Sequence, residues 1–120
     1  MTERRRFLRF MTKDVGVEYR ICHEKELNGS SCVKDLSREG TRFAISKKIE
    51  SGTLLDIKFL LPKEPKPVYL MGEVVWASET EEEKDPGYMI GVKFFKIDNF
   101  DRLRLLDHAY AEWLKSSKSY

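Results

Sequence analysis

Two groups of polar residues have types and spacings that suit the binding of an anionic ligand with hydrogen-bonding edges. The first is a cluster of arginines near the start of the sequence, within ERRRFLRF: Arg4, Arg5, Arg6 and Arg9. A planar guanidinium can donate two parallel hydrogen bonds to a phosphate or to the O6 and N7 atoms of guanine, and it can stack on a purine ring. Lysine lacks both abilities, so this all-arginine composition favours a phosphate-containing or purine-containing ligand.

The second group is DLSREG at 35–40, where Asp35, Ser37 and Gly40 stand at fixed offsets between two expected strands. The Asp35 carboxylate can accept hydrogen bonds from the ring N–H and the exocyclic amine of guanine, and Ser37 can donate or accept. Gly40 would let the backbone approach closely, and it could adopt a positive φ. Taken alone, each group has a simpler interpretation: a disordered basic tail for the arginines, and an ordinary turn capped by Asp and Ser for 35–40.

Composition limits the broad class of the protein. The 120 residues, 41% of them hydrophobic and 35% charged, suit one soluble domain with a single core. A net charge of +2 is too small for a general binder of nucleic-acid polymers or membrane surfaces, although five carboxylates gather at 79–85. No apolar run approaches the roughly 18 residues of a membrane span, and no secretory signal follows the arginines. We therefore expect a cytoplasmic protein without membrane insertion, in which Cys22 and Cys32 are reduced thiols.

The pattern of apolar residues predicts an all-β fold with a C-terminal helix. Six segments have the alternation or composition of strands: 15–22, 31–37, 41–46, 51–62, 68–78 and 87–97. Gly72 and Gly91 lie inside two of them, where glycine often marks a bulge, a sharp barrel bend or the close approach of another element. Strands of this number and spacing predict a six- to seven-stranded antiparallel barrel. We divide the chain into a flexible arginine-rich ligand-binding segment (1–14), the barrel (15–97) and an amphipathic helix (98–120).

The expected helix begins at Asp98 or Asn99, either of which can cap it. Its apolar residues share one side: Leu103, Leu106, Tyr110, Trp113 and Leu114. We expect this helix to pack on the barrel, with His108 on its solvent-facing surface. Trp76, Phe94 and Phe95 are expected in the core and the barrel wall.

The order of the two polar groups along the chain resembles a known signature. Arg5-x-x-x-Arg9 followed by Asp35-x-Ser37-x-x-Gly40 resembles the two-part motif of the PilZ family, bacterial receptor domains for cyclic di-GMP. The segments SGTLLDIKFLLP, GEVVWAS and GYMIGVKFFKI are similar to the later barrel strands of that family, so the resemblance extends from about Glu3 to Asp98. It implies a stand-alone receptor without catalytic activity, cofactor or metal, which signals by a change of shape or of partner affinity. The implied ligand-binding residues are Arg4, Arg5, Arg9, Asp35, Ser37 and Gly40.

In the resembled family, a basic residue just before the arginine motif tends to accompany two mutually intercalated ligand molecules. Arg4 occupies that position, and a third guanidinium would offset the repulsion among four phosphates. The alternative is that Arg4 adds only diffuse attraction, which would leave one ligand molecule per chain.

Other functions stay open at this point. The chain could be an adaptor of the same fold without a nucleotide, docking on a motility or secretion partner, and a binder of single-stranded RNA or DNA is a third alternative. Motifs of phosphate-binding loops and hydrolase elbows are absent from the sequence, so we expect no enzyme. A metal site formed by Cys22, His23 and Cys32 is disfavoured, because adjacent strand residues point to opposite faces.

Overall fold

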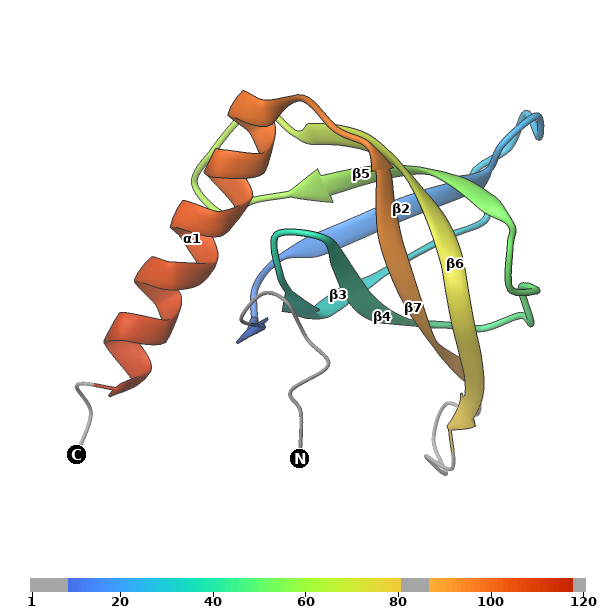
Figure 1. Ribbon diagram of the computed structural model, residues 1–120, viewed down its shortest axis with the longest axis horizontal. Helices are drawn as coiled ribbons and strands as arrows, with labels where there is room; N and C mark the ends of the chain where they lie inside the picture. Colours follow the sequence, from blue (N-terminus) through green and yellow to red (C-terminus); the bar gives the residue numbers. More distant parts are fainter. Residues whose placement is uncertain (1–8, 81–86, 118–120) are drawn as a thin grey trace.

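The computed structural model describes residues 9–80 and 87–117 as seven strands followed by one helix (Figure 1). The elements are β1 (Phe10–Met11), β2 (Gly16–Ile21), β3 (Gly29–Leu36), β4 (Gly40–Ile45), β5 (Leu54–Leu60), β6 (Val68–Thr80), β7 (Gly87–Lys96) and α1 (Asn99–Ser117). The predicted fold class is confirmed, and each of the six predicted strands corresponds to one of β2 to β7. Strand β1 was not predicted; it lies within residues 1–14, the segment expected to bind the ligand.

Six of the strands close into an antiparallel barrel. The hydrogen-bonded order is β3, β2, β5, β6, β7 and β4, and a further pairing of β3 with β4 joins the two ends. The short β1 adds to β3 through Phe10 opposite Leu36 and Met11 opposite Asp35. Strand β3 therefore pairs with β2 along its first half and with β1 along its last two residues. This arrangement places the segment that carries Arg9 directly beside Asp35.

The core fills the inside of the barrel with alternate residues of each strand, as the period-2 pattern predicts. Its largest fully buried side chains include Phe43, Phe59, Leu36, Leu55, Ile57 and Ile90. Phe94 belongs to this core and lies edge-on to Phe59, whereas Phe95 faces outward with 63% of its surface exposed.

Of the alternatives considered for Gly72 and Gly91, the pairing of β6 with β7 shows bulges beside both glycines, together with a close approach at Gly91. The register shifts between Met71 and Gly72, and again between Val74 and Trp76 opposite Gly91. A Cβ on Gly91 would lie 2.2 Å from the indole Nε1 of Trp76, so only glycine leaves room for this ring. Trp76 thus covers the barrel wall from outside, with 37% of its surface exposed.

The helix begins as predicted, because the Asp98 carboxylate accepts hydrogen bonds from the backbone N–H groups of Phe100 (3.0 Å) and Asp101 (3.2 Å). Arg104 then ties its first half to the loop between β5 and β6. The guanidinium donates to the Glu64 carboxylate at 3.2 Å and also contacts the Lys66 carbonyl oxygen.

The expected packing face of the helix was wrong for three of its five residues. Among the described side chains of the helix, Leu105 and Ala109 are buried against the barrel, and Leu106 and Leu114 are half-buried. Leu103, Tyr110 and Trp113 are 57%, 50% and 47% exposed. The helix lies against one end of the barrel, where it contacts β1, β3 and β6 (Figure 1). The sequence pattern could not show which side of the helix the barrel would meet.

Candidate functional site

The centre of the candidate site is Asp35, near the end of β3. Its side chain is 1% exposed, and each of its two carboxylate oxygens accepts a hydrogen bond from a different arginine. Arg9 Nη1 donates to Oδ1 at 3.2 Å, and Arg42 Nε donates to Oδ2 at 2.7 Å. Both arginine side chains remain about one third exposed, at 29% and 33%. The buried Asp35 carboxylate therefore fixes the positions of Arg9 and Arg42 at the protein surface.

Ser37 organises the turn that follows Asp35. Its hydroxyl oxygen accepts from the backbone N–H groups of Glu39 (3.3 Å) and Gly40 (3.2 Å), and its own N–H donates to the Gly40 carbonyl oxygen at 2.9 Å. Thr41 adds a further bond from its hydroxyl to the Asp35 carbonyl oxygen, at 2.8 Å. The capping role that the simpler interpretation gave to this stretch thus holds for Ser37 but not for the Asp35 carboxylate.

Gly40 is required by the packing of β4 on β7. A Cβ at this position would lie 2.2 Å from the carbonyl oxygen of Val92, closer than a side chain can approach. The positive φ considered for Gly40 is wrong, because among the described glycines only Gly52 has one, at 94°. The close backbone approach predicted for Gly40 therefore occurs, and its partner is the neighbouring strand.

Arg9 is placed by its neighbour in sequence, Phe10. The Phe10 ring lies edge-on to Tyr110 and to Trp113 of α1, with centroid distances of 6.2 Å in both cases. Tyr110 and Trp113 stack on each other at 5.7 Å. Any movement of Arg9 away from Asp35 would therefore pull on a residue that contacts the exposed aromatic side chains of the helix.

Of the six predicted ligand-binding residues, the structure brings together Arg9, Asp35, Ser37 and Gly40. Arg4 and Arg5 lie outside the described residues. Sequence reasoning missed Arg42, which faces Asp35 directly across the β3–β4 hairpin. The signal was present in the spacing, since the two residues flank the turn in positions that pair across the two strands.

Chemically, this arrangement can recognise a ligand with several negative charges. Arg9 and Arg42 already have one anionic partner in common, so a phosphate can replace that carboxylate on one of them and keep the guanidinium paired. Asp35 would then be free to accept from N–H groups of a base, the complementary half of guanine recognition.

Cys22 and Cys32 are not part of a potential metal-binding group among the described residues. Cys22 and Cys32 are both free, as predicted, with Cys22 half-buried and Cys32 exposed. The only described His, Cys, Asp and Glu side chains that gather as a potential metal-binding group are Asp14, His108 and Glu112. His108 is 19% exposed and faces Asp14, which corrects the expectation of a solvent-facing residue.

Comparisons with known proteins agree with the fold. The family profile described as PilZ domain matches residues 3–111, so the chain belongs to the PilZ domain family. None of the curated protein sequences is significantly similar to it.

Solved structures share the fold at low sequence identity. The PilZ domain with c-di-GMP of YcgR from Escherichia coli is similar with a TM-score of 0.77 and 13% identity, over 98% of this chain and 100% of that one. The K. pneumonia MrkH–c-di-GMP complex gives 0.77 and 18%, over 99% of this chain and 56% of that one. The Bacillus subtilis Inhibitor of motility (MotI/DgrA) gives 0.74 and 17%, over 99% and 55%. The chain thus spans about half the length of MrkH and MotI.

No helix in the described ranges, 9–80 and 87–117, is long and apolar enough to cross a membrane.

Proposed function

We propose that this protein is a cytoplasmic, non-enzymatic receptor for cyclic di-GMP. The observation that carries the proposal is the Asp35 carboxylate shared by Arg9 and Arg42 at the place where the family motif puts its ligand-binding residues. The solved PilZ domain of YcgR contains c-di-GMP, and so does the MrkH complex. No cofactor or metal is needed for this binding, and neither a nucleic-acid polymer nor membrane insertion forms part of the proposal.

In the proposed mechanism, ligand phosphates take over the guanidinium of Arg9, together with those of Arg4 and Arg5. The freed Asp35 oxygen then accepts from a guanine edge, with Ser37 and Gly40 shaping the turn beside it. Each charge-assisted hydrogen bond is worth about 1.5–3 kcal/mol, so a few of them can shift the position of the arginine segment. Because Arg9 precedes Phe10, this shift would reach Tyr110 and Trp113 on the helix and change the surface that a downstream partner meets.

Calorimetric titration with cyclic di-GMP tests the proposal directly. We expect saturable binding by the native chain, and no comparable heat from GMP or from single-stranded oligonucleotides. Arg9→Ala should weaken binding about 10- to 100-fold, the loss of one charge-assisted bond.

The matched control is Arg20→Ala, which removes a similar half-exposed arginine from its 3.0 Å contact with Asp56 on another part of the barrel. This variant should bind normally. If cyclic di-GMP at micromolar concentrations produces no heat, the receptor function is refuted. If Arg9→Ala and Arg20→Ala lose the same affinity, the ligand does not bind at Arg9.

We further propose that two mutually intercalated cyclic di-GMP molecules bind to each chain, because Arg4 supplies a third guanidinium beside the motif. The stoichiometry should be two for the native protein and one for Arg4→Leu. A native value of one would reject the two-molecule arrangement and leave the receptor function intact.

A second candidate is a protein-interaction adaptor of motility or secretion machinery, acting as a stand-alone effector with or without nucleotide. The observation that favours it is the outward-facing apolar side of α1, formed by Leu103, Tyr110 and Trp113. An exposed apolar stripe of this kind is typical of a docking surface. Leu103→Glu should abolish partner capture without changing nucleotide affinity if the helix serves this role.

A further inference from the structure

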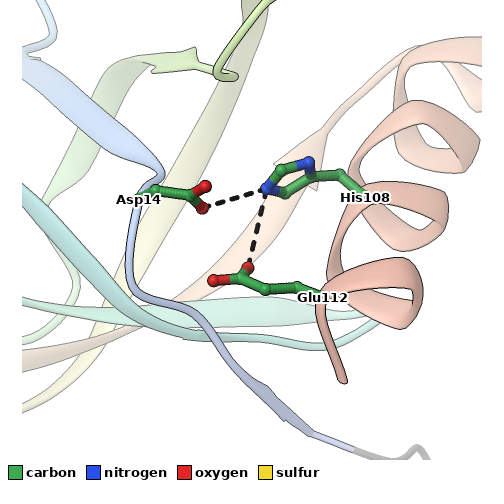
Figure 2. A group of neighbouring side chains, drawn as sticks. All are labelled: Asp14, His108 and Glu112. Carbon is green, nitrogen blue, oxygen red and sulfur yellow. Dashed lines mark hydrogen bonds and ion pairs between the residues drawn. The ribbon is translucent and has the colours of Figure 1, made fainter. Parts of the chain in front are cut away.

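Three side chains from two separate parts of the chain lie close together beside the second half of α1 (Figure 2). Asp14 lies in the loop between β1 and β2, while His108 and Glu112 stand one turn apart on α1. His108 Nε2 lies 3.2 Å from Asp14 Oδ1 and 3.6 Å from Glu112 Oε2. All three potential ligand atoms lie within 4.8 Å of one another.

The two carboxylates face the same ring nitrogen, and hydrogen bonds alone do not account for this. Nε2 carries at most one proton, whether the imidazole is neutral or charged, and that proton can point to only one of them. Glu112 Oε1 is already paired, because it accepts from the Lys13 backbone N–H at 3.0 Å. Glu112 Oε2 is buried and has no hydrogen-bond partner among the described residues. Glu112 Oε2 therefore lacks a hydrogen-bond donor, although it lies near His108 Nε2, because Asp14 Oδ1 lies closer to that nitrogen.

A cation placed between the three atoms resolves this conflict, since it attracts both carboxylates and the nitrogen lone pair together. Bonds of about 2.0–2.2 Å put the ligand atoms of a tetrahedral zinc site roughly 3.3 Å apart. The two distances from Nε2, 3.2 and 3.6 Å, bracket that value. The Asp14 side chain is 50% exposed and is free to turn toward Glu112 and complete the triangle. We propose that Asp14, His108 and Glu112 bind one Zn²⁺ ion, with water in the fourth position.

The donor set favours zinc over the commoner divalent cations. Imidazole nitrogen suits Zn²⁺ and its neighbours in the first transition row, whereas Mg²⁺ and Ca²⁺ prefer oxygen ligands alone. A bound ion would fasten the loop that carries Asp14 to the second half of α1. The site uses none of the residues assigned to the nucleotide, so it is independent of the proposed function.

Titration of the metal-free full-length protein with Zn²⁺ tests this inference. We expect one ion per chain and a rise in the melting temperature, with no such rise from Mg²⁺ or Ca²⁺. His108→Ala should lower the zinc affinity more than about tenfold, because even the loss of an outer-shell partner of a metal ligand typically costs that much. His23→Ala is the matched control, because it removes the other histidine of the chain from an exposed position, and it should bind as the native protein does.

Two further measurements guard against ambiguous outcomes. Glu112→Gln keeps the size of the side chain and an oxygen for the Lys13 N–H, so it should fold normally and still lose zinc affinity. Co²⁺ bound in place of Zn²⁺ should give a spectrum without thiolate charge-transfer bands, since neither Cys22 nor Cys32 is a ligand. Undiminished zinc affinity in Glu112→Gln, binding lost in His23→Ala, or a thiolate spectrum would each overturn the assignment.

Discussion

Asp35 supports the structure of this surface whether or not a nucleotide is present. It is the buried partner of two arginines and, through its carbonyl oxygen, of Thr41. A ligand-binding role alone, as the family resemblance implies for Asp35, would make Asp35→Ala weaken ligand binding with little effect on stability. The burial of its carboxylate changes the second half of that expectation.

We now predict that Asp35→Ala lowers the free energy of unfolding by about 1–3 kcal/mol, because it leaves the guanidiniums of Arg9 and Arg42 without their acceptor. Arg9→Ala should cost less than about 1 kcal/mol, as is usual for a partly exposed ion pair. Urea denaturation of the two variants measures the difference. Equal stabilities would show that the Asp35 contacts contribute little to the fold.

The two cysteines should differ in reactivity. Burial, and secondly the negative charge of Asp56, raise the pKa of the Cys22 thiol, so a smaller fraction is thiolate at a given pH. Cys32 is exposed on β3. Alkylation with iodoacetamide near neutral pH should therefore modify Cys32 first, as peptide mass spectrometry would show. The rate at Cys22 should rise in Asp56→Asn, and an unchanged rate there would contradict the electrostatic part of the cause.

At the scale of elements, the approach of β4 to β7 depends on Gly40. We predict that Gly40→Ala destabilises the protein by roughly 1–3 kcal/mol, because the new methyl group must displace the backbone at Val92. Gly16→Ala is the control within the same barrel, since a Cβ there meets only the Leu60 side chain at an ordinary 3.6 Å. Similar melting temperatures for the two variants would argue against close strand packing as the reason for Gly40.

The contact between β1 and α1 gives an optical test of the proposed signalling route. In a Trp76→Phe background, Trp113 is the remaining tryptophan of the chain. Phe10→Ala should shift its emission to longer wavelength, because the indole loses an edge-on ring and gains water. Cyclic di-GMP should produce a shift in the same direction in the Phe10-containing protein if β1 moves on binding. An emission shift caused by Phe10→Ala but not by cyclic di-GMP would show that nucleotide binding does not change the contact between β1 and the helix.

At the scale of the whole molecule, the barrel and the helix should differ in local stability. The barrel strands are hydrogen-bonded on both sides in a closed ring, whereas the helix has only Leu105 and Ala109 fully buried among its described residues. Segments with few buried contacts open more often than the core. Hydrogen exchange should therefore be faster in α1 than in β6 and β7, and equal protection would mean that the two unfold as one unit.

The repeating patterns of the sequence were sufficient to predict the architecture. Alternating apolar residues depend on the two-residue period of a strand, which is a local property, so the strands from 15 to 97 could be placed without knowing their partners. Asp98 could be recognised as a helix cap for the same reason. The motif carried by Arg5, Arg9, Asp35, Ser37 and Gly40 was equally visible, because it consists of residue types at fixed offsets.

Contacts between distant segments were decided only in three dimensions. The partnership of Arg42 with Asp35 depends on the register of the β3–β4 hairpin, and the pairing of β1 depends on an edge of β3 that β2 leaves open. The helix shows the limit most clearly: its pattern identified an apolar side at Leu103, Tyr110 and Trp113, but the barrel meets Leu105 and Ala109. The sequence determined the elements, since their periods are local, while the tertiary structure decided which faces and charges meet, since those depend on the packing of the whole chain.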